Sequence, residues 1–199
     1  MAKLTGTRRP KKLPYDGVRN AWYSTLPDPK PARVLQQDVT ADWAVLGGGT
    51  CGLTFARRLA ELRPDDSIAV VEAMRVGYGT SGRNAGFMLK HHSHGGIKNL
   101  DAAKNSDRLF QTGQGYLRDI VEQHQIRCQW NDWGQIYVSA STPGEAHLDD
   151  VADGFQTLGI EHQRLTQDEM EGITGTRFYQ RAVRVDGSAL VQPAAMMRG

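Results

Sequence analysis

A glycine-rich turn after a short apolar stretch constrains the fold of this chain more than any other feature. Residues 43–47 read WAVLG, and glycines then recur at Gly49 and Gly52. The apolar run shows no alternation, which predicts a strand buried on both faces. Beyond the turn, apolar residues recur at helical spacing over 50–63, and Pro64 ends the pattern. The sequence therefore predicts a strand, a tight turn and a helix in direct succession.

A second apolar run follows the helix. It reads IAVVEA at 68–73 and contains Glu72 near its end. Strand, turn, helix and strand together form a βαβ unit, in which the two strands are parallel and the crossover is right-handed. The expected fold class is α/β, with a Rossmann-like βαβ domain built on a parallel sheet.

The glycine spacing predicts a dinucleotide-binding turn. Gly47 permits the tight turn, Gly49 lets a pyrophosphate approach the backbone, and Gly52 lets the helix pack closely on the strand. The free N–H groups at the start of the helix, near Thr50 and Cys51, are placed to receive phosphate charge. The pattern is specific because strand, glycines and helix occur in register.

Glu72 lies 20 residues beyond Gly52. A carboxylate at this position accepts hydrogen bonds from ribose hydroxyls and repels a 2′-phosphate, so NADP is disfavoured. The glycine turn and the acid alone leave FAD and NAD open. The loop that follows, GYGTSGRNAGF at 77–87, favours FAD. It can run back under an extended cofactor and offer backbone N–H groups and the hydroxyls of Thr80 and Ser81, whereas a simple nicotinamide domain continues into another helix and strand.

With these two motifs the sequence resembles the FAD-dependent amine and amino-acid oxidoreductases of the D-amino-acid oxidase family. Within that family, the likeness is strongest to the gamma-glutamylputrescine oxidase-like proteins of bacteria. The likeness rests on GGGTCGLTFARRLAE, on VVEAMRVGYGTSGRNAGF, on the proline-rich lead-in and on VDGSALVQPAAMMRG at 185–199.

The resemblance implies an FAD site formed by both motifs. The glycine turn would hold the pyrophosphate, Glu72 the adenosine ribose, and the later loop the diphosphate, ribityl chain and flavin ring. Because no His or Cys precedes His91 in that loop, FAD would be bound non-covalently. The implied cofactor-binding residues are Gly47, Gly49, Thr50, Cys51, Gly52, Glu72, Ala73, Arg75, Thr80, Ser81, Gly82, Arg83, Asn84, Ala85 and Gly86. The catalytic residues stay unknown.

The resemblance also implies oxidation of the C–N bond of an amine or amino acid. A hydride would pass to the flavin, the imine would hydrolyse, and dioxygen or another acceptor would reoxidise the flavin. The expected partners are a small-molecule substrate and that electron acceptor. A flavin hydroxylase, an NAD-dependent dehydrogenase and a non-catalytic subunit that retains the dinucleotide fold stay open as alternatives.

The chain divides into four expected segments. Residues 1–40 carry eight Lys or Arg against three Asp, together with five of the eight prolines, which indicates an extended basic arm fastened by Trp22 and Tyr23. The other segments are a FAD-binding part at 41–100, the start of an α+β substrate domain with antiparallel strands at 101–184, and a return segment at 185–199.

Within the substrate domain the sequence predicts local elements with recognisable ends. They are a helix at 101–125, a hairpin at 128–141 that turns near 131–134, a helix with Pro143 in its first turn, a capping box from Thr166 to Glu169, and two short strands around Asp186 and Gly187. Members of the resembling family are longer. We therefore expect this chain to be inactive alone, to expose sheet edges and apolar surface, and to be completed by further residues or a second chain.

Composition excludes several other classes. No apolar run approaches the roughly 18 residues of a membrane span, and no secretory signal is visible, so a cytoplasmic location is expected. The net charge of +2 gives no reason to expect nucleic acid, and two cysteines do not suggest a disulfide framework. The run HHSHGG at 91–96 invites a metal interpretation, but it lacks a second ligand pair at a set distance. A polar loop or a cleft lining is expected there, with no metal.

Overall fold

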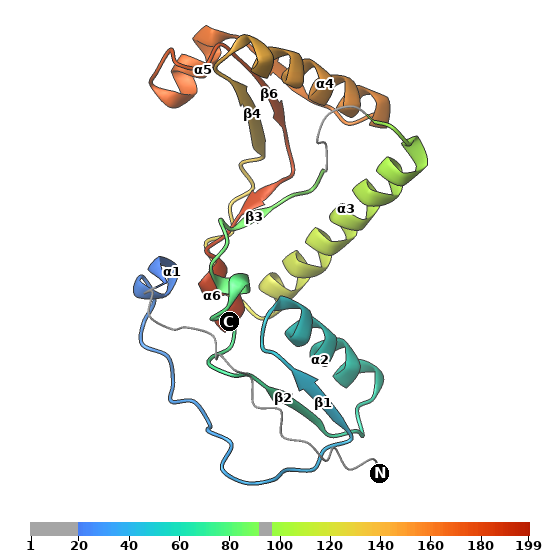
Figure 1. Ribbon diagram of the computed structural model, residues 1–199, viewed down its shortest axis with the longest axis vertical. Coiled ribbons are helices and arrows are strands. Elements are labelled where there is room, and N and C mark those ends of the chain that lie inside the picture. The colour runs from blue at the N-terminus through green and yellow to red at the C-terminus, as the bar shows by residue number, and fades with distance from the viewer. Residues whose placement is uncertain (1–19, 92–96) are drawn as a thin grey trace.

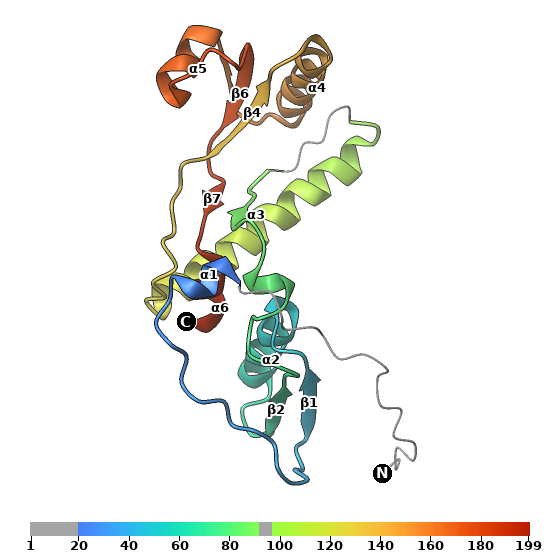
Figure 2. The same cartoon turned by 60° about the vertical axis from the view of Figure 1, so that its left-hand side comes forward.

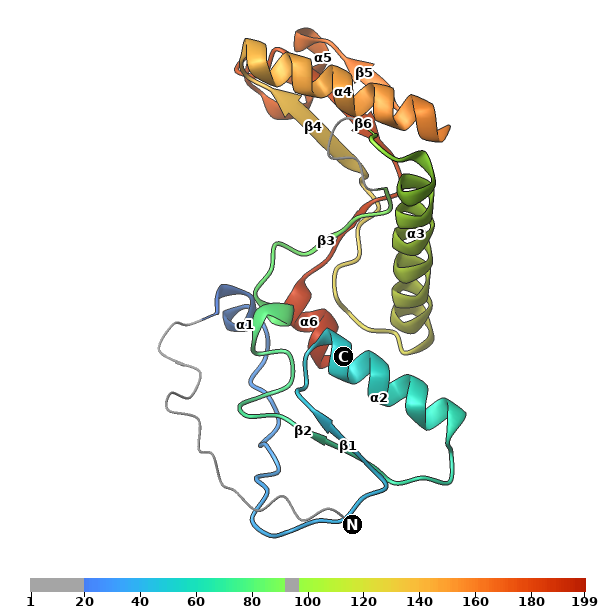
Figure 3. The same cartoon turned by 45° about the vertical axis from the view of Figure 1, so that its right-hand side comes forward.

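The computed structural model describes residues 20–91 and 97–199 as two groups of elements joined by a long helix (Figure 1). The first group holds β1 (Trp43–Leu46), α2 (Thr50–Leu62) and β2 (Ile68–Val71). The second holds a three-stranded sheet with two helices. Figures 2 and 3 show the two groups at opposite ends of an elongated molecule, with α3 (Leu100–Gln123) running between them.

The first group is the predicted βαβ unit. Strands β1 and β2 pair in parallel, from Trp43 opposite Ile68 to Leu46 opposite Val71. The predicted burial on both faces is wrong, because Val45 is 8% exposed on the side of α2 whereas Leu46 is 83% exposed. Helix α2 covers one face of this two-stranded sheet, and in the described part of the chain no element covers the other.

Short elements connect the two groups. They are α1 (Ala21–Ser24), the 3₁₀ turn η1 (Thr80–Gly82), β3 (Phe87–Met88), β7 (Ala189–Leu190) and α6 (Pro193–Arg198). Strands β3 and β7 pair antiparallel, with Phe87 opposite Leu190. Buried Val121, Cys128 and Val191 pack together beside this ladder, so α3 is fixed to the connection through its apolar face.

The second group is an antiparallel sheet in the order β4 (Gln135–Ser139), β6 (Arg181–Val185), β5 (Gln163–Leu165). Helix α4 (Thr142–Leu158) packs on one face, and α5 (Gln167–Thr174) contacts β6. The core between sheet and α4 consists of Leu148, Val151, Ala152, Phe155, Val183 and Val185. This confirms the expected antiparallel strands.

Local capping signals explain where these helices begin and end. Helix α4 starts with Pro143 in its first turn and stops at Gly159, whose φ of +69° is the left-handed conformation that glycine adopts most readily. The predicted capping box of α5 is present, because Thr166 and Glu169 bind each other's backbone N–H groups.

The predicted hairpin at 128–141 is wrong. Strand β4 pairs with β6 instead, and Asn131 forms a bridge with Leu190. Gly134 takes a φ of +81° between these two pairings, and its N–H donates to the carbonyl of Ser188. The two strands predicted around Asp186 and Gly187 exist as β6 and β7, but they belong to different sheets.

The described part of the arm, from residue 20 onwards, is extended apart from one helical turn. Asn20 caps α1 by accepting the N–H of Trp22, and the segment from 27 to 41 contains no helix or strand. The basic residues at 3–12 lie outside the described residues. Among the helices of the described part, none is both long and apolar enough to cross a membrane.

Candidate cofactor-binding site

The glycine turn has the geometry that its sequence predicts. Gly47 has a φ of +104°, and its N–H extends the parallel ladder by donating to the carbonyl of Val71 at 2.8 Å. A Cβ on Gly52 would lie 1.9 Å from the carbonyl oxygen of Gly47, so no side chain fits between helix and strand there. Only glycine at these two positions allows α2 to start directly behind β1.

Glu72 is bound to the backbone of two loops. Its Oε2 accepts the N–H of Gly48 at 2.7 Å, and its Oε1 accepts the N–H of Met74 at 3.1 Å. Its side chain is partly buried at the carboxyl end of β2. An ionised carboxylate has about four acceptor positions, so each oxygen retains one for a further donor such as a ribose hydroxyl.

The loop after Glu72 folds back onto the glycine turn. The N–H of Gly77 donates to the carbonyl of Gly48 at 2.8 Å, and the N–H of Thr50 donates to Oγ of Ser81 at 3.0 Å. The Thr50 N–H at the start of α2, which the sequence assigned to phosphate, is thus bound by a side chain of the second motif. The structure therefore brings the two predicted motifs into direct contact.

The remainder of the loop is fixed by its own side chains. Asn84 donates to the carbonyl of Ser81 at 2.7 Å and accepts the N–H of Gly86 at 2.7 Å. Gly86 has a φ of +80°, and a Cβ there would lie 2.1 Å from the carbonyl oxygen of Val191. Arg83 donates to the carbonyl of Tyr78 at 2.8 Å, with its guanidinium 4.5 Å from the centre of that ring.

A hollow of about 580 Å³ lies beside Glu72 and the edge of β2. Four cationic side chains border it, whereas Glu72 is the one acidic residue in its lining. The lining residues are Tyr23, Pro29, Lys30, Ala32, Arg33, Val70, Glu72, Met74, Arg75, Val76 and Arg198.

The residues present fit the phosphates of a dinucleotide. A Cβ built on Gly47 or on Gly79 would meet no atom within 4 Å, so space lies over the turn and the loop. The N-terminal end of α2 carries partial positive charge, and the cations around the hollow add to it. An anionic group next to this turn would be stabilised by its surroundings.

Some of the predicted site residues lie in the contact between turn and loop or at the hollow, and others do not. Glu72, Ser81 and Thr50 lie in the hydrogen-bonded contact between turn and loop, while Arg75 borders the hollow. Four other predicted residues lie nearby and are exposed, namely Cys51, Ala73, Thr80 and Ala85.

The sequence indicated that Trp22 and Tyr23 fasten the arm, but it did not indicate that the arm holds the loop from outside or that Asn20 and Gln192 take part. Asn20, Trp22 and Tyr23 each donate to a loop carbonyl, and Gln192, the N-cap residue of α6, donates to the carbonyl of Trp22. The expectation that Trp22 and Tyr23 fasten the arm is confirmed. No pattern in the sequence indicated Asn20 or Gln192, since their partners lie 62 and 170 residues away.

The histidine-rich run is only partly described. His91 is buried, and its Nδ1 lies 2.8 Å from Oδ1 of Asp107, whose Oδ2 accepts the side-chain N–H of Gln111. The residues at 92–96 lie outside the described part. Within the described ranges, no group of three or more His, Cys, Asp or Glu is arranged to hold a metal ion.

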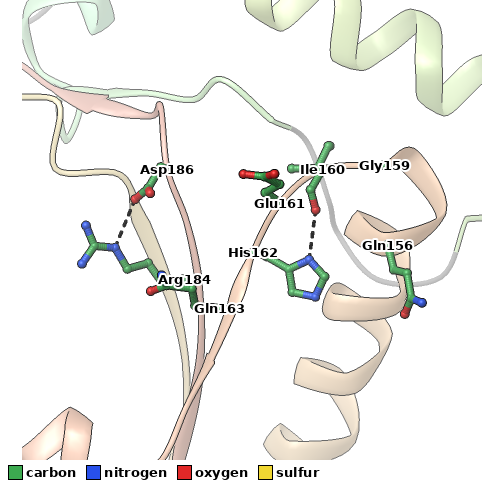
Figure 4. A pocket seen from close by; sticks show the side chains of 8 residues that line it. All are labelled: Gln156, Gly159, Ile160, Glu161, His162, Gln163, Arg184 and Asp186. Atoms are coloured by element: carbon green, nitrogen blue, oxygen red, sulfur yellow. Dashed lines mark hydrogen bonds and ion pairs between the residues drawn. The ribbon is translucent and has the colours of Figure 1, made fainter.

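A second hollow, of about 520 Å³, lies in the second group of elements, beside the start of β5 and the end of β6 (Figure 4). His162 hydrogen-bonds the carbonyl of Ile160 at 3.0 Å, and Arg184 donates to Asp186 at 3.1 Å. Most of the residues that line this hollow are polar, and they carry charges of both signs, Glu161 among them. The sequence did not predict this hollow.

Comparisons with known proteins agree on one family for this chain. The profile of the family DAO, FAD dependent oxidoreductase, matches residues 42–199. Gamma-glutamylputrescine oxidoreductase of Escherichia coli (strain K12) is 29% identical over 140 residues, a match covering 68% of this chain and 32% of that protein. The probable oxidoreductase OrdL of Rhizobium meliloti (strain 1021) is 37% identical over 187 residues, covering 90% and 43%.

Among solved structures, L-amino acid deaminase from Proteus myxofaciens has the same fold over a large part of the chain. The superposition has a TM-score of 0.64 at 17% sequence identity and covers 84% of this chain and 37% of that protein. This chain therefore spans less than half the length of each of these three proteins.

Proposed function

The chain belongs to the family of FAD dependent oxidoreductases, and we propose that it binds FAD at the contact between its glycine turn and the Ser81 loop. The observation that carries the proposal is the pair of bonds from Gly48 to Glu72 and from Thr50 to Ser81. These bonds gather the helix start, the acid and the hydroxyl loop at one edge of the parallel sheet, where ligands of α/β folds bind.

We assign the parts of FAD by the chemistry of the side chains. The pyrophosphate lies over Gly47, Gly49 and the start of α2, where dipole and backbone N–H groups favour negative charge. The adenosine lies in the hollow next to Glu72 and Arg75. FAD is held non-covalently, and the assigned residues are Gly47, Gly49, Thr50, Cys51, Gly52, Glu72, Ala73, Arg75, Thr80, Ser81, Gly82, Arg83, Asn84, Ala85 and Gly86.

The reaction proposed for the complete protein is oxidation of a C–N bond in an amine or amino acid. FAD supplies the electron acceptor for this chemistry, and the protein supplies position and charge. The names of the relatives, a gamma-glutamylputrescine oxidoreductase and an L-amino acid deaminase, support this substrate class. We name no catalytic residue in this chain.

The proposed division of labour follows the length comparison. Residues 41–100 form the FAD-binding part and 185–199 return to it, whereas 101–184 contribute part of a substrate domain. Because the chain spans 32% and 43% of the two curated relatives described above, we propose that further residues or a second chain complete the substrate site. The exposed face around Leu46 supports this view, since a face of that kind is normally covered.

The test uses the native protein, meaning the polypeptide that carries these residues as the cell produces it. We expect it to purify with the visible absorbance of oxidised flavin, released intact on denaturation. Addition of a substrate amine or amino acid without oxygen is expected to bleach this absorbance, and oxygen to restore it. A native protein that is colourless and does not take up added FAD would contradict the proposal. A protein that binds FAD but is bleached by no member of an amine and amino-acid panel would be a non-catalytic flavin-binding subunit.

A further inference from the structure

The N-terminal arm binds the outer side of the proposed FAD loop at three points. Each contact joins a side-chain donor of the arm to a backbone carbonyl of the loop. The bonds are Asn20 to Gly82, Trp22 to Asn84 and Tyr23 to Val76, each 2.9 Å long. The carbonyls are spread over residues 76–84, so the arm fixes the course of most of the loop.

The bond from Tyr23 acts on the peptide that touches the glycine turn. In a trans peptide the carbonyl and the next N–H point in opposite directions. Tyr23 binds the Val76 carbonyl on one side, and on the other side the Gly77 N–H donates to Gly48. Burial raises the pKa of Tyr23 despite the nearby Arg198, so its hydroxyl stays protonated and able to donate.

Helix α6 locks the arm in place. Gln192, which is 5% exposed, donates to the carbonyl of Trp22 at 2.8 Å and to the hydroxyl of Thr25 at 3.2 Å. Arg198 donates to the carbonyl of Pro27 at 2.9 Å. The arm is therefore held between the loop and α6, and its position is set by the fold.

The arm then forms one wall of the hollow beside Glu72. After α1 it runs past the β2 side of the parallel sheet before entering β1 (Figures 1 and 2). Lys30 and Arg33 of the arm line the hollow together with Glu72 and Arg75, which follow β2. Two cations on a segment outside the βαβ unit thus face the place assigned to the adenosine half of the cofactor.

We propose that residues 20–33 are a cofactor-retaining clasp, which rests on the FAD site proposed above. Hydrogen bonds from Tyr23, Trp22 and Asn20 hold the loop in its position against the glycine turn. Lys30 and Arg33 close the adenosine side and attract the negatively charged phosphates through the electrostatic field. The arm is thereby part of the binding site and contributes to how tightly FAD is held.

The first test measures the dissociation constant of FAD for the native apoprotein, together with its thermal unfolding. Tyr23→Phe removes one neutral hydrogen bond to the loop and is expected to weaken FAD about five-fold. Tyr179→Phe, in the loop before β6 in the second group of elements, is the matched control and is expected to leave FAD affinity unchanged. If Tyr23→Phe lowers the melting temperature of the apoprotein but leaves FAD affinity unchanged, the contact is only structural and the clasp is wrong.

The second test separates the two halves of FAD. The double variant Lys30→Ala/Arg33→Ala is expected to weaken FAD and ADP by the same factor and to weaken FMN less, because FMN lacks the adenosine half and keeps only one of the two phosphates. This loss is expected to shrink at high salt. The matched control removes two exposed lysines near the start of α3, Lys98→Ala/Lys104→Ala. Equal FAD affinity in the double variant and the wild type would contradict the proposal that Lys30 and Arg33 contribute to FAD binding.

The two proposals fail in different ways. If the wild-type native protein binds neither FAD nor ADP, the FAD site itself is wrong. If the wild type binds FAD and both arm variants bind it equally well, the site stands and the clasp is wrong.

Discussion

The carboxylate of Glu72 accepts the backbone N–H of Gly48 at 2.7 Å, which joins the end of β2 to the glycine turn after β1. One side chain thereby ties together the carboxyl ends of the two parallel strands. The bond holds the acid in the lining of the hollow, and each carboxylate oxygen retains an acceptor position for a further donor. Glu72 is thus both a structural brace of the turn and the residue assigned to the ribose.

Replacing this acid tests both roles. Glu72→Gln removes the negative charge and places an amide group where two N–H donors need acceptors. We expect FAD affinity to fall about ten-fold and the apoprotein to lose about 1–3 kcal/mol of unfolding free energy. Fluorescence titration with FAD and chemical denaturation measure the two effects. Unchanged FAD affinity in a destabilised variant would leave Glu72 with the structural role alone.

Two glycine-to-alanine changes give opposite predictions. Gly52→Ala puts a methyl group 1.9 Å from the Gly47 carbonyl, so α2 must shift, and we expect a loss of about 1–3 kcal/mol in unfolding free energy with FAD binding abolished. Gly113→Ala in α3 meets no atom within 4 Å and removes the entropy cost of glycine in a helix. It is expected to stabilise the protein by about 0.5–1 kcal/mol. Denaturation curves that show equal effects would contradict the close helix–strand contact.

The two cysteines differ in reactivity. Cys51 is exposed in the first turn of α2, whereas Cys128 is fully buried and burial raises the pKa of its thiol. We expect a thiol reagent to modify Cys51 first and to reach Cys128 only on unfolding. Bound FAD is expected to slow modification of Cys51, because the pyrophosphate lies over the same turn. Peptide mass spectrometry of the alkylated protein measures both rates, and a Cys51 rate that FAD leaves unchanged would count against the assigned position of the pyrophosphate.

We expect the stability of the second group of elements to depend on pH through Asp149. Hydrogen bonds from Arg164 and then Arg181 lower the pKa of Asp149, which links α4 to β5 and β6. A carboxyl whose pKa is lower in the folded than in the unfolded state stabilises the fold above its unfolded-state pKa of about 3.9, and this stabilisation is lost as the pH falls through the lower folded-state value. We expect the difference in unfolding free energy between wild type and Asp149→Asn to be largest near neutral pH and to shrink in acid. Parallel pH profiles for the two proteins would contradict this assignment.

Structural features that depend only on residues close together in the sequence were predictable. The glycine turn, the acid after β2, the Pro143 start of α4 and the capping box at Thr166 each depend on local backbone geometry and short-range hydrogen bonds. The sequence also indicated that the loop at 77–87 belongs with the glycine turn. It did not specify that Ser81 itself binds the Thr50 N–H.

Features that depend on distant partners were not predictable in this way. The alternation at 128–141 suits any antiparallel partner, and the choice of β6 over a local hairpin is made by the core that Val183 and Val185 form with α4. The apolar run of β1 suggested two covered faces, but coverage depends on which other elements are present. The arm contacts of Asn20 join residues 62 positions apart, which no local pattern encodes.

A crystal structure of the native protein with FAD is the most direct test of the proposed site. We predict pyrophosphate density over Gly47 and Gly49 at the start of α2, with a ribose hydroxyl within hydrogen-bonding distance of the Glu72 carboxylate. FAD bound elsewhere on the protein, or a Glu72 carboxylate that contacts only the N–H groups of Gly48 and Met74, would contradict it.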